Sequence, residues 1–96
     1  MDDTGIRQEV IKEICELARK YDITKVILFG SRARGDFKRT SDIDIAATGG
    51  NFARFALDVD EETNTLLEYD IVNLDSYVQD DLLEAIKNEG RILYEK

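Results

Sequence analysis

The chain has 96 residues, of which 43% are hydrophobic and 35% are charged, and its formal net charge at pH 7 is −8. This length leaves room for one small core, so we expect a single domain over residues 1–96. The net charge argues against direct binding of nucleic acid, which depends on Lys and Arg neutralising phosphates. Histidine is absent and Cys15 is the only cysteine, so any metal would need oxygen ligands, which favours Mg²⁺ or Mn²⁺. With no signal-peptide pattern and no long apolar run, the expected location is the cytoplasm, away from membranes.

Hydrophobic periodicity predicts secondary structure in the order α-β-(short α)-β-α-β-α-β. The predicted ranges, in chain order, are 5–21, 25–29, 31–35, 42–47, 51–67, 69–74, a helix that opens at the capping-box sequence 76–79 and ends at Gly90, and 91–94. This order predicts an α/β (α+β) fold in which a small mixed sheet is packed with helices.

A Gly-Ser turn directly follows the first predicted strand, at Gly30 and Ser31. Glycine allows the backbone to approach a ligand closely, and N–H groups at the start of a helix attract anions. Ser31 adds a hydroxyl donor, and Arg32 and Arg34 are candidates for contacting phosphate oxygens. The arginines have an alternative role, because either could pair with Asp36 or with acidic residues of a helix.

Two carboxylates lie on one face of the second predicted strand, since Asp42 and Asp44 are two residues apart. Such a pair can bridge two divalent ions, which is the arrangement that phosphoryl and nucleotidyl transfer use. Asp70, early in the next strand, is the candidate third ligand, and it could instead be a structural acid at a strand end. Asp75 is a competing carboxylate, although its position indicates a loop or the start of a helix.

The segment GSRARGDFKRTSDID, residues 30–44, has ten residues between Ser31 and Asp42. It resembles the GSx10DxD motif of the DNA polymerase β-like nucleotidyltransferase superfamily, and it is most similar to the minimal nucleotidyltransferase (MNT) branch. The resemblance covers nearly the whole chain in length and element order, and Asp70 matches the family's third acidic position.

The resemblance implies a fold, an activity and a partner. Such domains bind ATP with two Mg²⁺ ions and transfer AMP to a hydroxyl group. MNT proteins are commonly antitoxins of HEPN-domain toxins, which they silence by adenylylating a toxin tyrosine (AMPylation). Carried over to this sequence, Gly30 and Ser31 would hold the triphosphate, Asp42 and Asp44 would bind both metals, and Asp70 would bind one metal and orient or deprotonate the acceptor hydroxyl.

Two other functions remain open from the sequence. The chain could be a non-catalytic antitoxin that neutralises its partner by forming a complex, with its acidic surface facing a basic toxin. It could also be a nucleotidyltransferase that modifies a small molecule, although 96 residues leave little protein for a separate acceptor pocket. The nucleotide itself is not specified by any motif.

Overall fold

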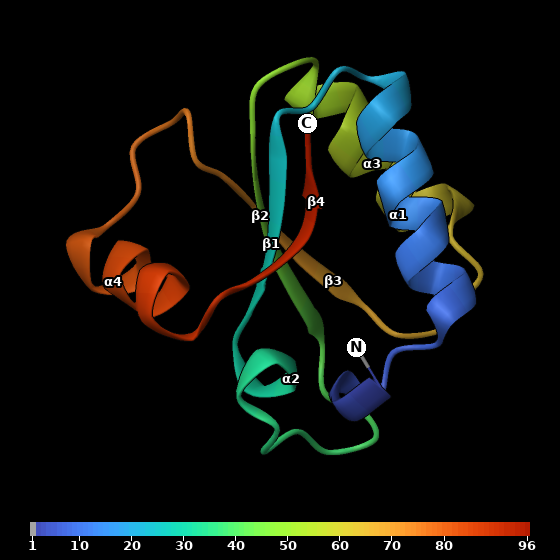
Figure 1. The fold of residues 1–96 in the computed structure, drawn as a ribbon, viewed down its shortest axis with the longest axis vertical. Coiled ribbons are helices and arrows are strands. Elements are labelled where there is room, and N and C mark those ends of the chain that lie inside the picture. Colours follow the sequence, from blue (N-terminus) through green and yellow to red (C-terminus); the bar gives the residue numbers. More distant parts are fainter. Residues whose placement is uncertain (1) are drawn as a thin grey trace.

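The fold is built on one four-stranded mixed sheet, which a computed structural model describes together with the rest of residues 2–96 (Figure 1). The strand order is β3-β2-β1-β4; β1 is antiparallel to both β2 and β4, and β2 is parallel to β3. The strands are β1 (Lys25–Phe29), β2 (Ile43–Thr48), β3 (Tyr69–Asn73) and β4 (Arg91–Glu95). The helices are α1 (Gln8–Lys20), α2 (Ser31–Arg34), α3 (Phe52–Glu62) and α4 (Asp80–Glu89), with a 3₁₀ turn at Asp2–Thr4. The predicted fold class and element order are confirmed.

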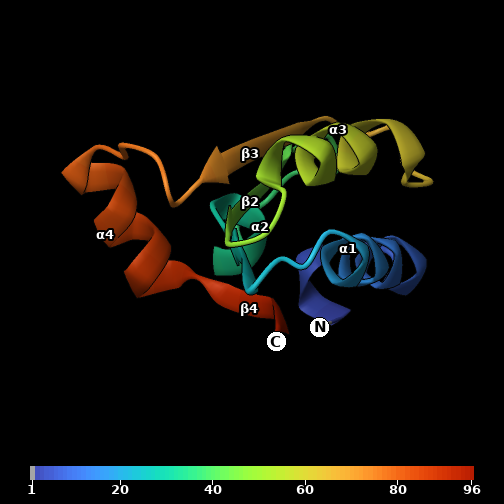
Figure 2. The ribbon, with the colours of Figure 1, turned by 90° about the horizontal axis from the view of Figure 1, so that it is seen from above.

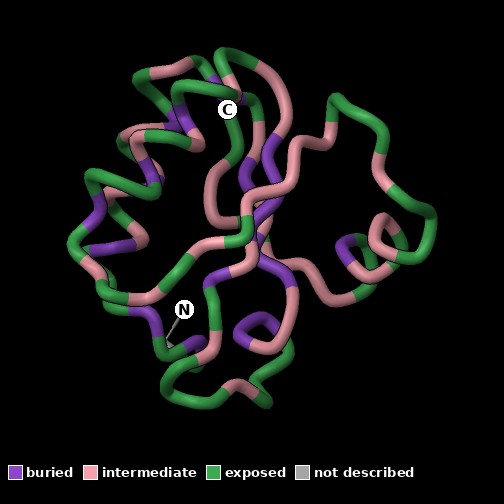
Figure 3. Tube along the Cα trace, turned by 180° about the vertical axis from the view of Figure 1, so that it is seen from behind, coloured by how far each residue is buried: buried purple, intermediate pink, exposed green. Residues whose placement is uncertain are grey.

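The helices lie on both faces of the sheet (Figures 1 and 2). Helices α1 and α3 cover one face, where the larger core forms around fully buried residues such as Ile14, Leu28 and Phe55. Helix α4 lies on the opposite face, where Ile86 packs in a smaller cluster with Phe29 and Ala46. Buried segments accordingly concentrate in the central strands and on the inner sides of the helices (Figure 3). None of the helices within residues 2–96 combines the length and apolar character required to cross a membrane.

The predicted extension of the third helix to residue 67 is wrong, because α3 ends at Glu62. The Thr63 hydroxyl donates to the carbonyl of Val59, and the backbone N–H of Asn64 donates to a carboxylate oxygen of Glu13 in α1. These contacts turn the chain away from the helix axis. Leu66, which lies within the predicted helix range 51–67, is fully exposed.

The predicted capping box at residues 76–79 is also wrong, since α4 begins at Asp80. The carboxylate of Asp75 accepts hydrogen bonds from the Thr48 hydroxyl (2.5 Å) and the Gly49 N–H (2.7 Å). This attachment to the end of β2 lowers the pKa of Asp75, with the hydroxyl contact as the main cause. The chain is thereby held at the sheet edge, and residues 76–79 span the distance to α4.

Phe55 tests the larger core, because its side chain is fully buried in α3. We expect Phe55→Ala to lower the free energy of unfolding by about 3–5 kcal/mol, through lost burial and the cavity left behind. The matched control is Leu57→Ala in the same helix, whose side chain is 46% exposed and should cost well under half as much. Urea unfolding followed by circular dichroism measures both. Equal losses in the two variants would contradict this packing.

Candidate functional site

The strand register brings the predicted acidic residues to one place on the sheet. Phe29 of β1 lies opposite Asp44 of β2, and Asp44 lies opposite Asp70 of β3. Because paired residues on adjacent strands point to the same face, Asp44 and Asp70 share the face that α4 partly covers. Asp42 immediately precedes β2 and is exposed, as is Asp70, whereas Asp44 is half-buried. The three carboxylates therefore differ in solvent exposure, and Asp44 is the least exposed of them.

The environment of Asp44 disfavours its charged form. Burial raises the pKa of this carboxyl to about 6, and the negative charges of Asp70 and then Asp42 add to the effect. Arg34 and Arg32 oppose the shift but do not cancel it. A bound cation would relieve both the burial cost and the repulsion among these carboxylates.

Gly30 lies against the Asp44 carboxylate at the end of β1. Its φ angle is +76°, and a Cβ atom at this position would lie 2.2 Å from Oδ2 of Asp44. Any side chain here would thus both strain the backbone and displace the carboxylate. The Gly-Ser turn therefore lies directly against the carboxylate of Asp44.

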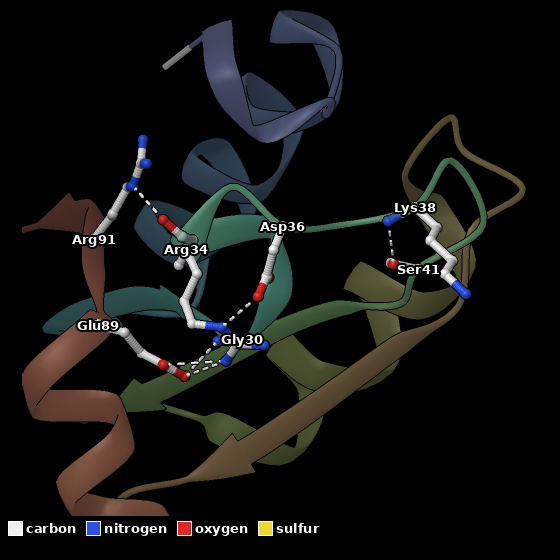
Figure 4. A network of polar contacts seen from close by, with 8 residues as sticks. Gly30, Arg34, Asp36, Lys38, Ser41, Glu89 and Arg91 are labelled. Atoms are coloured by element: carbon white, nitrogen blue, oxygen red, sulfur yellow. Dashed lines mark hydrogen bonds and ion pairs between the residues drawn. The ribbon is translucent and has the colours of Figure 1, made fainter.

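Arg34 forms a bridge between two acidic residues beside this turn (Figure 4). Its Nη1 lies 3.1 Å from both carboxylate oxygens of Glu89, and its Nε lies 3.2 Å from Oδ2 of Asp36. These hydrogen bonds raise the pKa of Arg34, the one to Glu89 most strongly. Glu89 also accepts a hydrogen bond of 3.1 Å from the Gly30 N–H. The pairing of Arg34 with Asp36 and a helix acid matches the alternative that the sequence left open.

Arg32 has a different environment from the one that phosphate binding would require. Its side chain is buried, and its guanidinium donates to backbone carbonyls of Thr4, Ser41, Arg39 and Lys38 at 2.9–3.5 Å. Burial lowers the pKa of Arg32. The ring of Phe37 lies 4.9 Å from the guanidinium carbon. In this structure Arg32 fastens the loop between the Gly-Ser turn and the acidic strand.

Glu89 is the contact residue that sequence reasoning did not single out. It is the last residue of α4, where a negative charge is unfavourable next to the negative end of the helix dipole. An acid at this position is the one local signal that could have drawn attention to it. Its partners, Gly30 and Arg34, are more than fifty residues away in the chain.

The acidic site suits a metal that shares its ligands with a substrate. Across residues 2–96, no group of three His, Cys, Asp or Glu side chains is placed to hold a metal ion by itself. Mg²⁺ typically takes one or two carboxylates and completes its octahedron with water and substrate phosphates. The oxygen-only donor set, the repulsion on Asp44 and the Gly30 contact fit that mode of binding. The residues fit Mg²⁺ delivered with a polyphosphate better than a permanently bound ion.

A separate hollow of about 500 Å³ lies between the start of α1 and the loop after α3. Its lining residues are Arg7, Thr63, Asn64, Thr65 and Leu66. This lining contains no carboxylate side chain, so it offers no ligand for a divalent cation. The candidate site residues lie elsewhere, where β1 ends and where β2 and β3 begin.

Comparison with known proteins agrees with this geometry. Residues 9–96 match the model of the family described as "Polymerase beta, Nucleotidyltransferase". A relative from Methanocaldococcus jannaschii is named "Putative protein adenylyltransferase MJ0604". It is 37% identical to this chain over an alignment 100 residues long with gaps counted, and the alignment covers 91% of this chain and 97% of the relative. The chain belongs to the polymerase β nucleotidyltransferase family, and the family match together with this relative identifies it as a nucleotidyltransferase.

Solved structures with a similar fold include chains of toxin-antitoxin complexes. One is a crystal structure of a toxin-antitoxin with AMP-PNP; it has a TM-score of 0.66 and 27% identity, and the match covers 90% of this chain and 73% of that one. Another is a mutant of the toxin-antitoxin MntA-HpeT, with a TM-score of 0.67 and 26% identity over 88% of this chain and 72% of that one. The resemblance to minimal nucleotidyltransferases inferred from residues 30–44 is thereby confirmed.

The raised pKa of Asp44 predicts that Asp44→Asn stabilises the metal-free protein at pH 7–8. The folded-state pKa of about 6 lies above the unfolded-state value of 3.8, so wild-type stability falls as pH rises between these values and stays reduced above them. The full shift corresponds to about 3 kcal/mol, and partial exposure reduces the expected gain to about 1–2 kcal/mol. Urea unfolding in EDTA at pH 4 and pH 8 measures it. Asp60→Asn, an exposed position in α3, is the control, and a gain of equal size at both pH values would refute the assignment.

The contacts of Arg32 predict that the substitution Arg32→Met lowers the stability of the folded protein. Five hydrogen bonds to backbone carbonyls disappear, and we expect the free energy of unfolding to drop by about 2–4 kcal/mol. Arg39→Met, in the same loop but exposed, should change stability by less than about 0.5 kcal/mol. Thermal unfolding and nucleotide binding are measured together. Unchanged stability with lost nucleotide binding would mean that Arg32 is a phosphate ligand after all.

Proposed function

We propose that this nucleotidyltransferase is an antitoxin that transfers AMP from ATP to a hydroxyl group, that of a tyrosine, on a partner HEPN-domain toxin. One observation carries the catalytic part of the proposal. The positive-φ Gly30 lies against the Asp44 carboxylate, and the strand register places Asp70 beside Asp44. This proximity supports a site in which the turn binds phosphate and the acidic strand binds metal.

The residues of the site divide the work of holding the donor nucleotide. The N–H groups of the turn and the Ser31 hydroxyl would donate to triphosphate oxygens, and Asp42, Asp44 and Asp70 would hold two Mg²⁺ ions. The bound ions would neutralise phosphate charge and stabilise the attacking and leaving oxygens. Arg34, which is 45% exposed, is the cation available to the phosphates, whereas Arg32 is committed to the loop.

The acceptor side of the reaction assigns a role to Asp70, which is exposed at the edge strand β3. Its carboxylate orients the acceptor hydroxyl and takes its proton. The acceptor oxygen forms a bond to the α-phosphorus, the bond between the α- and β-phosphates breaks, and pyrophosphate leaves. The product is a phosphodiester between AMP and the acceptor side chain.

The structure favours a partner protein as the source of the acceptor hydroxyl. The acidic site lies open at the strand ends, and the 500 Å³ hollow is placed elsewhere, with no carboxylate in its lining. The solved toxin-antitoxin structures support a toxin as that partner. The name of the archaeal relative supports a protein as the acceptor and AMP as the transferred group.

The test is a transfer assay with each of the four nucleoside triphosphates, labelled at the α-phosphate, and the product of the neighbouring gene. With Mg²⁺ we expect label from ATP to enter the partner, and a mass increase of one AMP on a tyrosine. Asp42→Asn and Asp44→Asn should each reduce the rate at least about 100-fold, because each removes a carboxylate from the metal-binding pair. Addition of EDTA should abolish transfer.

Asp60→Asn removes an exposed carboxylate of α3 and should leave the transfer rate unchanged, which controls for net charge. Neutralisation of the toxin that survives both Asp42→Asn and Asp44→Asn, without any AMP adduct, would instead identify a non-catalytic antitoxin. Transfer to an aminoglycoside but not to the partner would identify a small-molecule enzyme.

A further inference from the structure

Glu89 occupies the donors that a phosphate would need at the Gly-Ser turn. Its Oε1 accepts from the Gly30 N–H and from Nη1 of Arg34, both at 3.1 Å, and its Oε2 accepts from the same Nη1 (Figure 4). A carboxylate and a phosphate use the same kinds of donor, a backbone N–H and a guanidinium. The side chain of Glu89 is only 20% exposed, so the contact is partly sheltered from water.

Local forces do not explain an acid at this position. Glu89 is the final residue of α4, and a negative charge there is repelled by the helix dipole. The contacts that hold its carboxylate are tertiary ones, to a glycine at the end of β1 and to an arginine of α2. The unfavourable interaction of the Glu89 charge with the helix dipole is therefore offset by its hydrogen bonds to Gly30 and Arg34, at the Gly-Ser turn.

The fold also fixes where Glu89 is held. Ile86, one turn earlier in α4, is buried in the smaller core with Phe29, the residue that precedes Gly30. Gly90 follows directly, and a Cβ there would lie 2.2 Å from the Ile86 carbonyl oxygen and 2.6 Å from Cγ2 of Ile27 in β1. The end of α4 is thus packed tightly against β1, and the Glu89 carboxylate is kept within reach of the turn.

We propose that Glu89 is an internal competitor of the nucleoside triphosphate, and so sets the affinity of the site for nucleotide. The inference rests on the proposed function, because it takes the Gly30–Ser31 turn as the phosphate site. To bind, the triphosphate displaces the Glu89 carboxylate from the Gly30 N–H and Arg34, and the side chain swings towards solvent. Glu89 is not a catalytic residue, since it contacts the donors and not the reacting atoms.

The test compares the affinity of the protein for α,β-methylene-ATP with Mg²⁺, measured by isothermal titration calorimetry. This analogue cannot be cleaved at the reacting bond, so binding is measured without turnover. Glu89→Gln should bind it about three- to tenfold more tightly than the wild type, as expected from removing one partly exposed ionic competitor. Glu84→Gln, an exposed acid of the same helix, changes net charge equally and should leave the affinity unchanged.

A second control isolates the contact with Gly30. Asp36 also pairs with Arg34, through Nε, but it does not reach the Gly30 N–H. Asp36→Asn should therefore strengthen binding less than Glu89→Gln does, and an equal gain would overturn the proposal. In the metal-free protein, Glu89→Ala should shift the Gly30 amide resonance in NMR spectra, whereas Glu84→Gln should not.

The remaining outcomes separate this proposal from the proposed function. Wild-type binding that Glu89→Gln leaves unchanged or weakens would overturn the competitor role alone, and weakening would mean that Glu89 positions Arg34 for the phosphates. Absence of binding in the wild type and in both Glu89 variants would overturn the nucleotide site itself, and the competitor with it.

Discussion

The position of β2 between an antiparallel and a parallel neighbour is the constraint on which the rest of the structure depends. Antiparallel pairing with β1 places Phe29 opposite Asp44, so the turn that begins at Gly30 emerges beside that carboxylate. Parallel pairing with β3 places Asp70 on the other side of the same residue.

A slip of one residue in either pairing would turn a carboxylate into the core formed with α1 and α3, at a large desolvation cost. The buried side chains of Ile43 and Ile45 oppose such a slip, because they need that same core. Hydrophobic burial on one face of the sheet thus fixes the chemistry on the other.

The site that results has an unfavourable arrangement of negative charges around Asp44. Three carboxylates influence one another there: burial and the negative charges of Asp70 and Asp42 raise the pKa of Asp44 to about 6. Two basic residues accompany them, but their partners differ. Arg32 is buried among backbone carbonyls and holds the intervening loop, whereas Arg34 remains at the surface between Asp36 and Glu89. Cations delivered with a polyphosphate would relieve the repulsion among the acids, and the phosphates would compete for Arg34.

The opposite face of the sheet is covered by a single helix, α4, within the part of the chain that the structure describes. Helix α4 contacts the sheet through a small cluster around Ile86, while α1 and α3 share the larger core. The last residue of α4 is also the one that reaches the Gly-Ser turn. In the proposed function, the nucleotide and the Glu89 carboxylate compete for the same two donors, the Gly30 N–H and Arg34. On the other side, β3 is the edge strand of the sheet and its Asp70 is exposed.

The sequence by itself determined the element order, the fold class and the family, because hydrophobic spacing and the segment from Gly30 to Asp44 are local patterns. It also indicated that Asp42 and Asp44 share a face, which follows from the two-residue period of a strand. Only the tertiary structure decided where α3 ends and where α4 begins, since Asn64 and Asp75 are held by residues far away in the chain. Only the tertiary structure separated the two arginines, which are equivalent in sequence but differ in burial. The role of Glu89 also depends on the fold, because its partners Gly30 and Arg34 meet it only when α4 packs on the sheet, and no local pattern encodes that contact.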